Sequence, residues 1–220
     1  MITTLLPLIA LGFFLGMRHA TDPDHVVAVT TIVAREKRMS MAALIGVLWG
    51  VGHAATILLV GGAIILFGIV IPPRLGLTME FSVALMLVLL GALNLSGIAP
   101  PPSDPPRSRY ATAARPITIG VVHGLAGSAA IALLVLAAVH SAAAAIAYLA
   151  IFCVGTIAGM MLMTSALVLP IVATKGRFTH LNEWIGRGTG VVSVLFGLFM
   201  AYQVGIHDGL FFGHPVWSPN

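Results

Sequence analysis

The sequence Arg18-His19-Ala20-Thr21-Asp22-Pro23-Asp24-His25 places five ionisable side chains within eight residues. It lies inside a long apolar stretch that runs from Ile2 to Ala34. A charged group near the bilayer centre costs about 2.5 to 3.5 kcal/mol on insertion scales, so such groups persist there only when paired, hydrated or bound to an ion. Pro23 lacks an amide hydrogen and clashes with the preceding turn. The stretch therefore predicts a membrane helix that is broken near Asp22.

The alternative is an extramembrane turn between two short segments. The residues before the cluster are long enough for a marginal span. The segment Val26 to Ala34 is too short for a second one, because a span needs about 20 residues. Under this alternative, Val26 to Ala34 would therefore be an apolar segment that is too short to cross the membrane.

The composition of the whole chain supports a membrane protein. The 220 residues are 59% hydrophobic and only 8% charged, whereas soluble domains carry about 25% charged residues. A formal net charge of +4 is a small excess and gives no reason to expect nucleic acid binding. The single Cys153 excludes a disulfide framework and a paired-cysteine redox site. The pattern also predicts no prosthetic group.

Six apolar stretches are long enough to cross a bilayer, which predicts an all-α, polytopic membrane protein. They are Ile2–Ala34, Met41–Val70, Phe81–Ile98, Ile117–Val139, Ala142–Ala173 and Gly188–Ile206. The predicted organisation is a first three-helix unit (1–99), a proline-rich loop (100–116), a second three-helix unit (117–206) and a C-terminal tail (207–220).

Basic residues outside the cluster are distributed unevenly among the connections. Nine fall after the first, third and fifth stretches, and only Arg74 falls after the second or fourth. Cytoplasmic loops of membrane proteins carry the excess of Lys and Arg. We therefore expect the odd-numbered loops in the cytoplasm, both termini outside, and the chain in the cytoplasmic (inner) membrane.

The two halves share short patterns. Gly16-Met17-Arg18-His19 is echoed by Gly120-Val121-Val122-His123, and Trp49–His53 is weakly echoed by Phe152–Thr156, in each case 103 or 104 positions later. Three spans per half would make the second half enter from the opposite side. The pattern predicts a 3+3 inverted repeat, which is typical of secondary transporters with broken helices and midplane sites.

The histidines and aspartates of the cluster suit a metal ion. His19 and Asp22 would share a face on a regular helix, and the break would bring His25 to the same cavity. Imidazole nitrogens with carboxylate oxygens favour borderline ions such as nickel, cobalt, zinc and copper. We expect one of the two aspartates to offset the ion's charge and Arg18 to pair with a carboxylate when the site is empty.

Two further histidines lie within predicted spans. His53 follows Gly50 and Gly52, which allow close helix approach, so it is either a ligand or a hydrogen-bonded packing residue. His123 occupies the repeat-equivalent of His19 and is open to three readings: a ligand, a proton carrier or a helix–helix hydrogen bond. Binding requires neutral imidazole, so metal affinity should fall as the pH drops through the histidine range.

The cluster resembles a known family signature. His19-x4-Asp24-His25 is similar to the HX4DH motif of the nickel/cobalt transporter superfamily, and Gly52-His53 resembles the start of its second motif, G-H-S/T. The resemblance implies a secondary transporter that takes up Ni²⁺ or Co²⁺. It assigns the metal to His19, Asp22, Asp24, His25 and His53. Arg18 and His123 are additional candidates for the transport site because of the charge pairing and the repeat described above.

The sequence also departs from the family pattern. Ala54 replaces the small hydroxyl residue of the second motif, and the later D-T-A-T-E-type motif is absent. The segment from His123 to Ser128 stands in its place and looks like the short, UreH-like branch associated with urease accessory proteins. The resemblance does not settle nickel against cobalt, and an exporter of the same superfamily remains an alternative.

An alternative of a different class is an intramembrane zinc hydrolase, since several histidines and an aspartate can hold zinc with an open position for water. Such an enzyme needs a separate general base. None of the three glutamates, Glu36, Glu80 and Glu183, falls within a predicted span. We therefore expect no enzymatic activity. The expected partners are a divalent metal ion and the lipid bilayer, and the sequence leaves open whether the chain forms a homo-oligomer.

Overall fold

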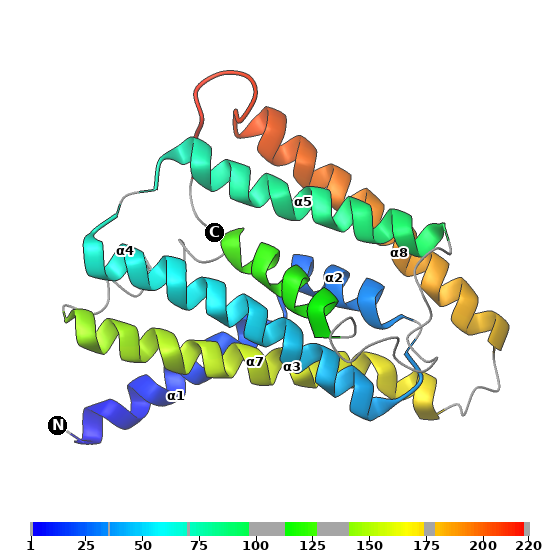
Figure 1. Ribbon diagram of the computed structural model, residues 1–220, viewed down its shortest axis with the longest axis horizontal. Helices are drawn as coiled ribbons and strands as arrows, with labels where there is room; N and C mark the ends of the chain where they lie inside the picture. The colour runs from blue at the N-terminus through cyan, green and yellow to red at the C-terminus, as the bar shows by residue number, and fades with distance from the viewer. Residues whose placement is uncertain are drawn as a thin grey trace.

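The computed structural model describes residues 2–34, 36–69, 71–96, 113–126, 141–173 and 179–217. All regular secondary structure in these ranges is helical, as the composition predicted (Figure 1). The α-helices are α1 (Ile2–His19), α2 (Pro23–Val33), α3 (Met39–Thr56), α4 (Gly62–Phe67), α5 (Pro73–Leu95), α7 (Ala142–Ala173) and α8 (Thr179–Tyr202), with a further helix over 113–126. Two π-helical turns, Ile57–Gly61 and Gln203–His207, continue α3 and α8.

Four helical stretches are long and apolar enough to cross a membrane by length and composition. They are Met39–Phe67, Pro73–Leu95, Ala142–Pro170 and Gly186–His207, and they correspond to the second, third, fifth and sixth predicted spans. The first predicted span is divided between α1 and the shorter apolar helix α2. Of the fourth, predicted over 117–139, only residues up to 126 are described, and most of the proline-rich loop (100–116) also lies outside the described residues.

The break in the first stretch is confirmed. α1 ends at His19 and α2 begins at Pro23, a proline in the first turn of the helix, where its missing amide hydrogen is harmless. Asp22, between them, has extended backbone angles (φ −61°, ψ 146°). The backbone amide of Thr21 donates to the carbonyl oxygen of Arg18 at 2.8 Å, which tightens the turn.

Two predicted boundaries are wrong. The third helix begins at Pro73 and not at Phe81, so Glu80 lies inside a candidate span. The last helix begins at Thr179, which places Arg187 on a helix and not in a connection. Both errors have the same cause: apolar runs mark the part of a helix that suits lipid, whereas a helix itself extends to its first favourable N-terminal residue, such as Pro73.

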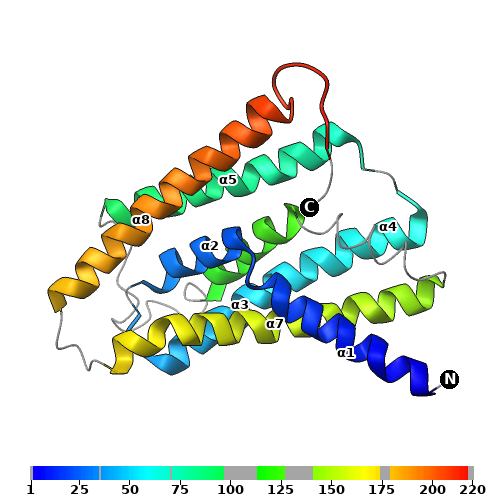
Figure 2. The ribbon, with the colours of Figure 1, turned by 180° about the vertical axis from the view of Figure 1, so that it is seen from behind.

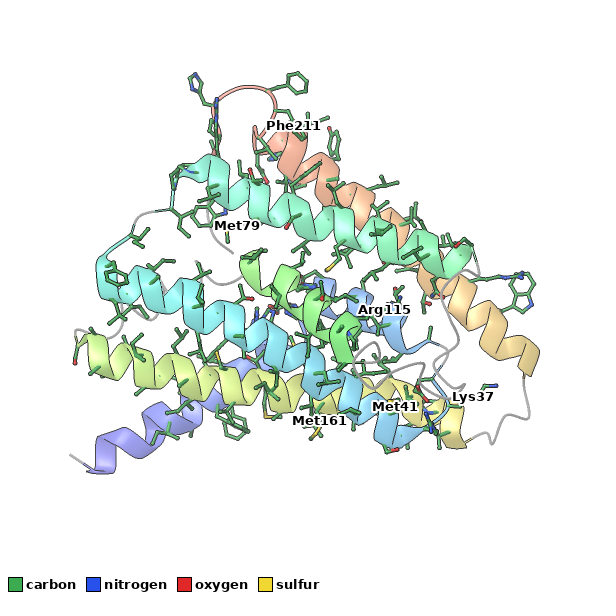
Figure 3. The ribbon with its side chains drawn as sticks, viewed as in Figure 1. Lys37, Met41, Met79, Arg115, Met161 and Phe211 are labelled. Atoms are coloured by element: carbon green, nitrogen blue, oxygen red, sulfur yellow. The ribbon has the colours of Figure 1, made fainter. Side chains whose placement is uncertain are left out.

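The helices form two groups with a short pair between them (Figures 1 and 2). α7 packs against both α1 and α3, and α5 packs against α8. α2 and the helix over 113–126 lie between these groups, and α2 contacts α8, α5 and α7. In Figure 3, Lys37 lies between the end of α2 and the start of α3. Phe211 lies beyond the C-terminal end of α8.

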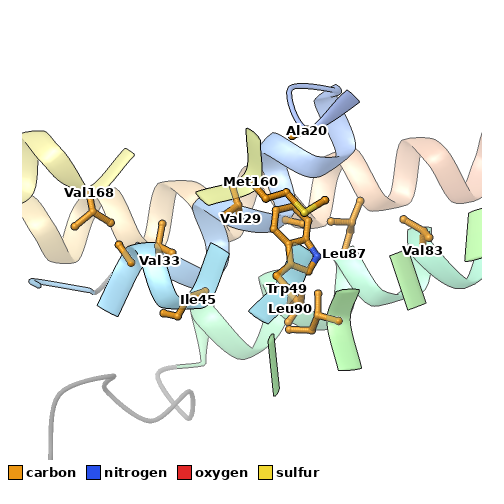
Figure 4. Close-up of a cluster of buried hydrophobic side chains, with 13 residues drawn as sticks. Ala20, Val29, Val33, Ile45, Trp49, Val83, Leu87, Leu90, Met160 and Val168 are labelled. Carbon is orange, nitrogen blue, oxygen red and sulfur yellow. The ribbon is translucent and has the colours of Figure 1, made fainter. Parts of the chain in front are cut away.

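A continuous core joins these groups. Trp49 of α3 is fully buried and belongs to one apolar cluster with Val29 of α2, Leu87 and Leu90 of α5, and Met160 of α7 (Figure 4). Large hydrophobic side chains remain exposed on the outside of the helices, as expected of a lipid-facing surface. Examples are Phe14, Leu59, Leu66, Phe67, Leu195 and Phe199.

Candidate metal centre

Four histidines from four helices meet at the break in the first stretch. His19 ends α1, His25 lies in the first turn of α2, His53 lies on α3, and His123 lies on the helix over 113–126. His25 is central: its ring centroid lies 4.7 Å from that of His19, 5.0 Å from that of His53 and 4.3 Å from that of His123. His25, His53 and His123 are buried.

Close helix packing brings His53 and His123 to this point. A Cβ atom on Gly52 would collide with the carbonyl oxygen of Ile117, and one on Gly124 would lie 2.7 Å from the carbonyl oxygen of His53. Only glycine therefore allows α3 and the helix over 113–126 to approach this closely. The expectation that small residues beside His53 permit close contact is confirmed.

Asp22 orients His19. Its Oδ2 accepts a 2.8 Å hydrogen bond from Nδ1 of His19, and the Asp22 side chain makes no capping bond to α2. Because an ionised carboxylate can only accept, this bond places the His19 proton on Nδ1 and leaves a lone pair on Nε2. That Nε2 lies 3.1 Å from Nε2 of His53.

Asp24 holds two other histidines at once. Its Oδ1 lies 3.1 Å from Nδ1 of His25, and its Oδ2 lies 2.8 Å from Nε2 of His123. The second contact joins residues 99 positions apart. By the same argument, Nε2 of His25 and Nδ1 of His123, the ring nitrogens that do not contact Asp24, are left without protons.

Among the described residues, three buried imidazole nitrogens have no hydrogen-bond partner: Nε2 of His25, Nδ1 of His53 and Nδ1 of His123. Buried polar atoms in proteins nearly always have a partner, so each such atom needs an explanation. A bound cation would supply the partner that lone pairs on Nε2 of His25 or Nδ1 of His123 lack.

The donor atoms lie close enough together to share an ion. Two sets each have one donor per residue, all within 4.8 Å of one another: His19, His25 and His53, and Asp24, His25 and His123.

The structure thus brings together six of the seven candidate residues: His19, Asp22, Asp24, His25, His53 and His123. Arg18 is different: its side chain is exposed, and no ion pair between described residues joins it to a carboxylate. The expected pairing of Arg18 is therefore absent from the described part of the chain. The carboxylates of Asp22 and Asp24 instead contact imidazole rings.

Sequence reasoning missed one neighbour of the centre. The ring centroid of Trp49 lies 5.6 Å from that of His25 and 5.8 Å from that of His123, so its indole packs beside both imidazoles. Its position one helical turn before His53 on α3 was the available signal.

The two aspartates also bear on the hydrolase alternative. The carboxylates of Asp22 and Asp24 are hydrogen-bonded to three of the four imidazoles, those of His19, His25 and His123. Glu80, which does lie in a span, accepts a 2.8 Å hydrogen bond from Nε1 of Trp217. Each of these three carboxylates therefore already accepts at least one hydrogen bond.

The chain is similar to the urease accessory protein UreH of Bacillus sp. (strain TB-90). The two are 35% identical over 219 residues, which cover 94% of this chain and 96% of the relative. The chain belongs to the UreH family, within the nickel/cobalt transporter superfamily. The family assignment made from the HX4DH-like motif is therefore confirmed. The name of the UreH relative describes it as a urease accessory protein.

Two plant proteins are more distant relatives of this UreH-family chain. They are the chloroplast proteins FOR GROWTH AND FERTILITY 2 and 1 of Arabidopsis thaliana, at 26% and 27% identity over 85% and 87% of the chain. The matched regions cover 54% and 60% of these plant proteins. No protein-family model matches the chain, and no solved structure matches it.

Proposed function

We propose that this protein is a secondary transporter that carries Ni²⁺ or Co²⁺ into the cell across the cytoplasmic membrane. The observation that supports this most directly is the cluster of buried histidines at the break of a membrane helix. Imidazole nitrogens are ligands that favour borderline divalent metal ions. The UreH-family membership agrees with a role in nickel or cobalt transport.

In this proposal His19, His25 and His53 bind the ion, and the aspartates orient them. Asp22 fixes the ring of His19, and Asp24 fixes that of His25, as carboxylates behind metal-bound histidines do. The two carboxylates also offset the ion's double charge. In this proposal the role of Asp22 is to orient the ring of His19.

We propose that transport involves rocking of two three-helix halves that are related as an inverted repeat. Reciprocal glycine contacts between the helices support the repeat. A Cβ on Gly16 of α1 would collide with the carbonyl oxygen of Phe152 on α7. One on Gly120 would collide in the same way with the carbonyl oxygen of Trp49 on α3. Gly16 and Gly120, like Trp49 and Phe152, are the positions that the sequence patterns of the two halves pair.

The third helices of the two halves show the same reciprocity. A Cβ on Gly91 of α5 would lie 2.8 Å from the backbone nitrogen of Val194 on α8. One on Gly197 of α8 would lie 2.8 Å from the backbone nitrogen of Val88 on α5. Two structurally equivalent halves can rock against each other around a central site, which would open the site alternately to each side.

Energy must come from outside the chain. The sequence contains no phosphate-binding loop of the G-x-x-x-x-G-K-S/T type. The transport of a double positive charge inward is favoured by the membrane potential, which is worth about 2.3 kcal/mol per charge at 100 mV.

The test is metal uptake by cells that make His19→Ala, Asp24→Ala or His25→Ala variants, each checked for membrane insertion. We expect all three to lose uptake above the background of cells without the protein. His207→Ala is the matched control, because His207 is exposed in the last π-helical turn and bonded to Asp208, outside the cluster. Normal uptake by three correctly inserted cluster variants would exclude the proposal.

A further inference from the structure

We infer that residues 208–217, the segment that follows the last π-helical turn, form a gate over one end of the path to the histidine cluster. Trp217 closes this tail gate by packing between α5 and the helices on the other side of the path. The ion passes when Trp217 leaves that position. The inference rests on the proposed transport function, because it concerns the route by which the ion reaches the cluster.

The tail gate folds back from the end of α8 to the start of α5 (Figure 1). The backbone amides of Leu210 and Phe211 donate to carbonyl oxygens of the last π-helical turn, and that of Val216 donates to the carbonyl oxygen of Asp208. The ring of Phe211 meets that of Phe81 on α5 edge to face, with the centroids 5.1 Å apart. The tail gate is therefore a defined part of the fold that reaches from α8 to α5.

Trp217 joins two groups of helices. Its Nε1 donates a 2.8 Å hydrogen bond to Oε1 of Glu80 on α5, and a Cβ atom added to Gly76 would lie 2.3 Å from its indole ring. The same indole packs against an apolar cluster from α3, α4 and α7 that includes Ala54 and Leu149. The side chain therefore fills space between α5 and those three helices, near the start of α5.

The apolar cluster beneath Trp217 borders the histidine cluster. Ala54 directly follows His53 on α3. Phe152 belongs to the same apolar cluster, and its ring centroid lies 5.5 Å from that of His19. Displacement of Trp217 would therefore open the molecule on the side of these two histidines.

Glu80 gives the proposed path an acidic side chain. It lies inside a candidate membrane span, where a carboxylate is costly and by default marks a functional path. It lies within electrostatic range of Asp24 in the histidine cluster and of Asp208 in the tail gate. Carboxylates along a path attract a divalent cation. While Trp217 donates to Glu80, one oxygen of this carboxylate is occupied, so opening the tail gate would also free it.

The tail gate contains residues at which the backbone can turn. Gly209 and Gly213 have φ angles of 81° and 99°, a region that glycine occupies at no steric cost. Residues 211–214 are exposed. Lids of membrane and soluble proteins move by φ/ψ changes at a few such loop residues. A rotation at these glycines would lift Trp217 from α5 without unwinding a helix.

The first arm of the experiment locks the tail gate shut. The purified full-length double variant Gly76→Cys/Trp217→Cys is joined by a short bis-methanethiosulfonate linker and placed in vesicles, and Co²⁺ flux is measured before and after reduction. We expect flux at the level of empty vesicles while the linker is intact, and recovery once a reductant has cleaved it. Each single-cysteine variant, treated in the same way, should keep the flux that it had before treatment.

The second arm opens the tail gate and needs no transport. His53→Cys, at a position that is fully buried, serves as a reporter for a small thiol reagent in detergent. We expect Trp217→Ala and Gly76→Ala each to speed its labelling several-fold. The methyl group of Gly76→Ala meets the indole, whereas alanine itself favours a helix. Gly188→Ala, with nothing within 4 Å, should leave the labelling rate unchanged.

Variants of Glu80 separate the hydrogen bond from the packing. Glu80→Ala removes the acceptor and should speed the labelling of the reporter. Glu80→Gln keeps a carbonyl oxygen that accepts from the indole, so its labelling rate should stay near that of the reporter alone. Size-exclusion chromatography confirms that each variant is folded.

The inference is overturned if the cross-linked protein carries Co²⁺ as well as the reduced one does, or if neither Trp217→Ala nor Gly76→Ala speeds labelling. The proposed function would survive either result, since the wild type would still carry the ion. A wild type without Co²⁺ flux overturns the proposed function, and the labelling rates then decide alone whether the segment covers the histidine cluster.

Discussion

At the residue scale, the important feature is that the two aspartates are not equivalent. Asp22 contacts one histidine, His19, whereas Asp24 contacts both His25 and His123. A carboxylate behind a ligating imidazole sets its tautomer and ring orientation, and it raises the basicity of the ligand nitrogen. The cluster is thus a set of oriented lone pairs, and its affinity depends on groups that need not touch the ion.

We predict that Asp22→Ala weakens Ni²⁺ binding by about 10- to 100-fold, because His19 loses the acceptor that orients it. Asp22→Asn should lose less, since its amide oxygen still accepts a bond from Nδ1 of His19. Isothermal titration of the purified protein measures both constants.

The matched control for this prediction is Asp208→Ala. Asp208 forms a similar 2.9 Å pair with an exposed histidine, His207, in the last π-helical turn and the tail that follows it. Its removal should leave Ni²⁺ binding unchanged. Equal affinities for Asp22→Ala and Asp208→Ala would show that Asp22 does not support the site.

At the element scale, the centre depends on helices that cross with backbones in contact. Gly16 lets α1 meet α7, and Gly120 lets the helix over 113–126 meet α3. These two crossings place His19 and His123, each three residues further along its helix. A shift of either crossing would move a donor atom.

We predict that Gly16→Ala and Gly120→Ala each lower stability by about 1–3 kcal/mol, because the added methyl group meets backbone that cannot yield. Gly188→Ala on α8 is the control: nothing lies within 4 Å of the position, and alanine favours a helix. Thermal unfolding in detergent, followed by tryptophan fluorescence, ranks the three variants. The packing account is wrong if Gly188→Ala is as unstable as the other two.

At the scale of the whole molecule, the orientation predicted from the basic loops stays a prediction that labelling can test. Lys37 is exposed between α2 and α3, and His214 is exposed in the tail. The single native cysteine, Cys153, is buried and should give little background. We expect a membrane-impermeant maleimide to label His214→Cys in intact cells and Lys37→Cys only after permeabilisation.

The reverse pattern, with Lys37→Cys labelled in intact cells, would mean that the termini are cytoplasmic. Labelling of both variants in intact cells would exclude the expected multi-span topology between these positions. Wild-type protein, carrying only Cys153, measures the background under each condition.

The sequence was most informative where the evidence is local. The break follows from Pro23, and the grouping of His19 with Asp22 and His25 follows from their spacing around it. His53 was proposed from the glycines beside it. These inferences need only helix geometry and the cost of burying charge.

The rest of the centre could not be read from spacing. The bond between Asp24 and His123 joins residues in different halves, and only the packing of the helices decides that they meet. For the same reason, the sequence predicted that Arg18 pairs with a carboxylate, and the described residues do not show this pair. It also could not decide among three possible roles for His123. The starts of α5 and α8 were missed because hydropathy reports the lipid-facing part of a helix and not its ends.

The central claim is that the histidine cluster carries a metal ion across the membrane. The most direct test is radiotracer Ni²⁺ and Co²⁺ flux into sealed vesicles that contain only the purified protein, with and without a proton gradient, for the wild type and His25→Ala. The account predicts saturable flux by the wild type and flux at the level of empty vesicles for His25→Ala. Equal flux by the two proteins, or none above empty vesicles by the wild type, would contradict it.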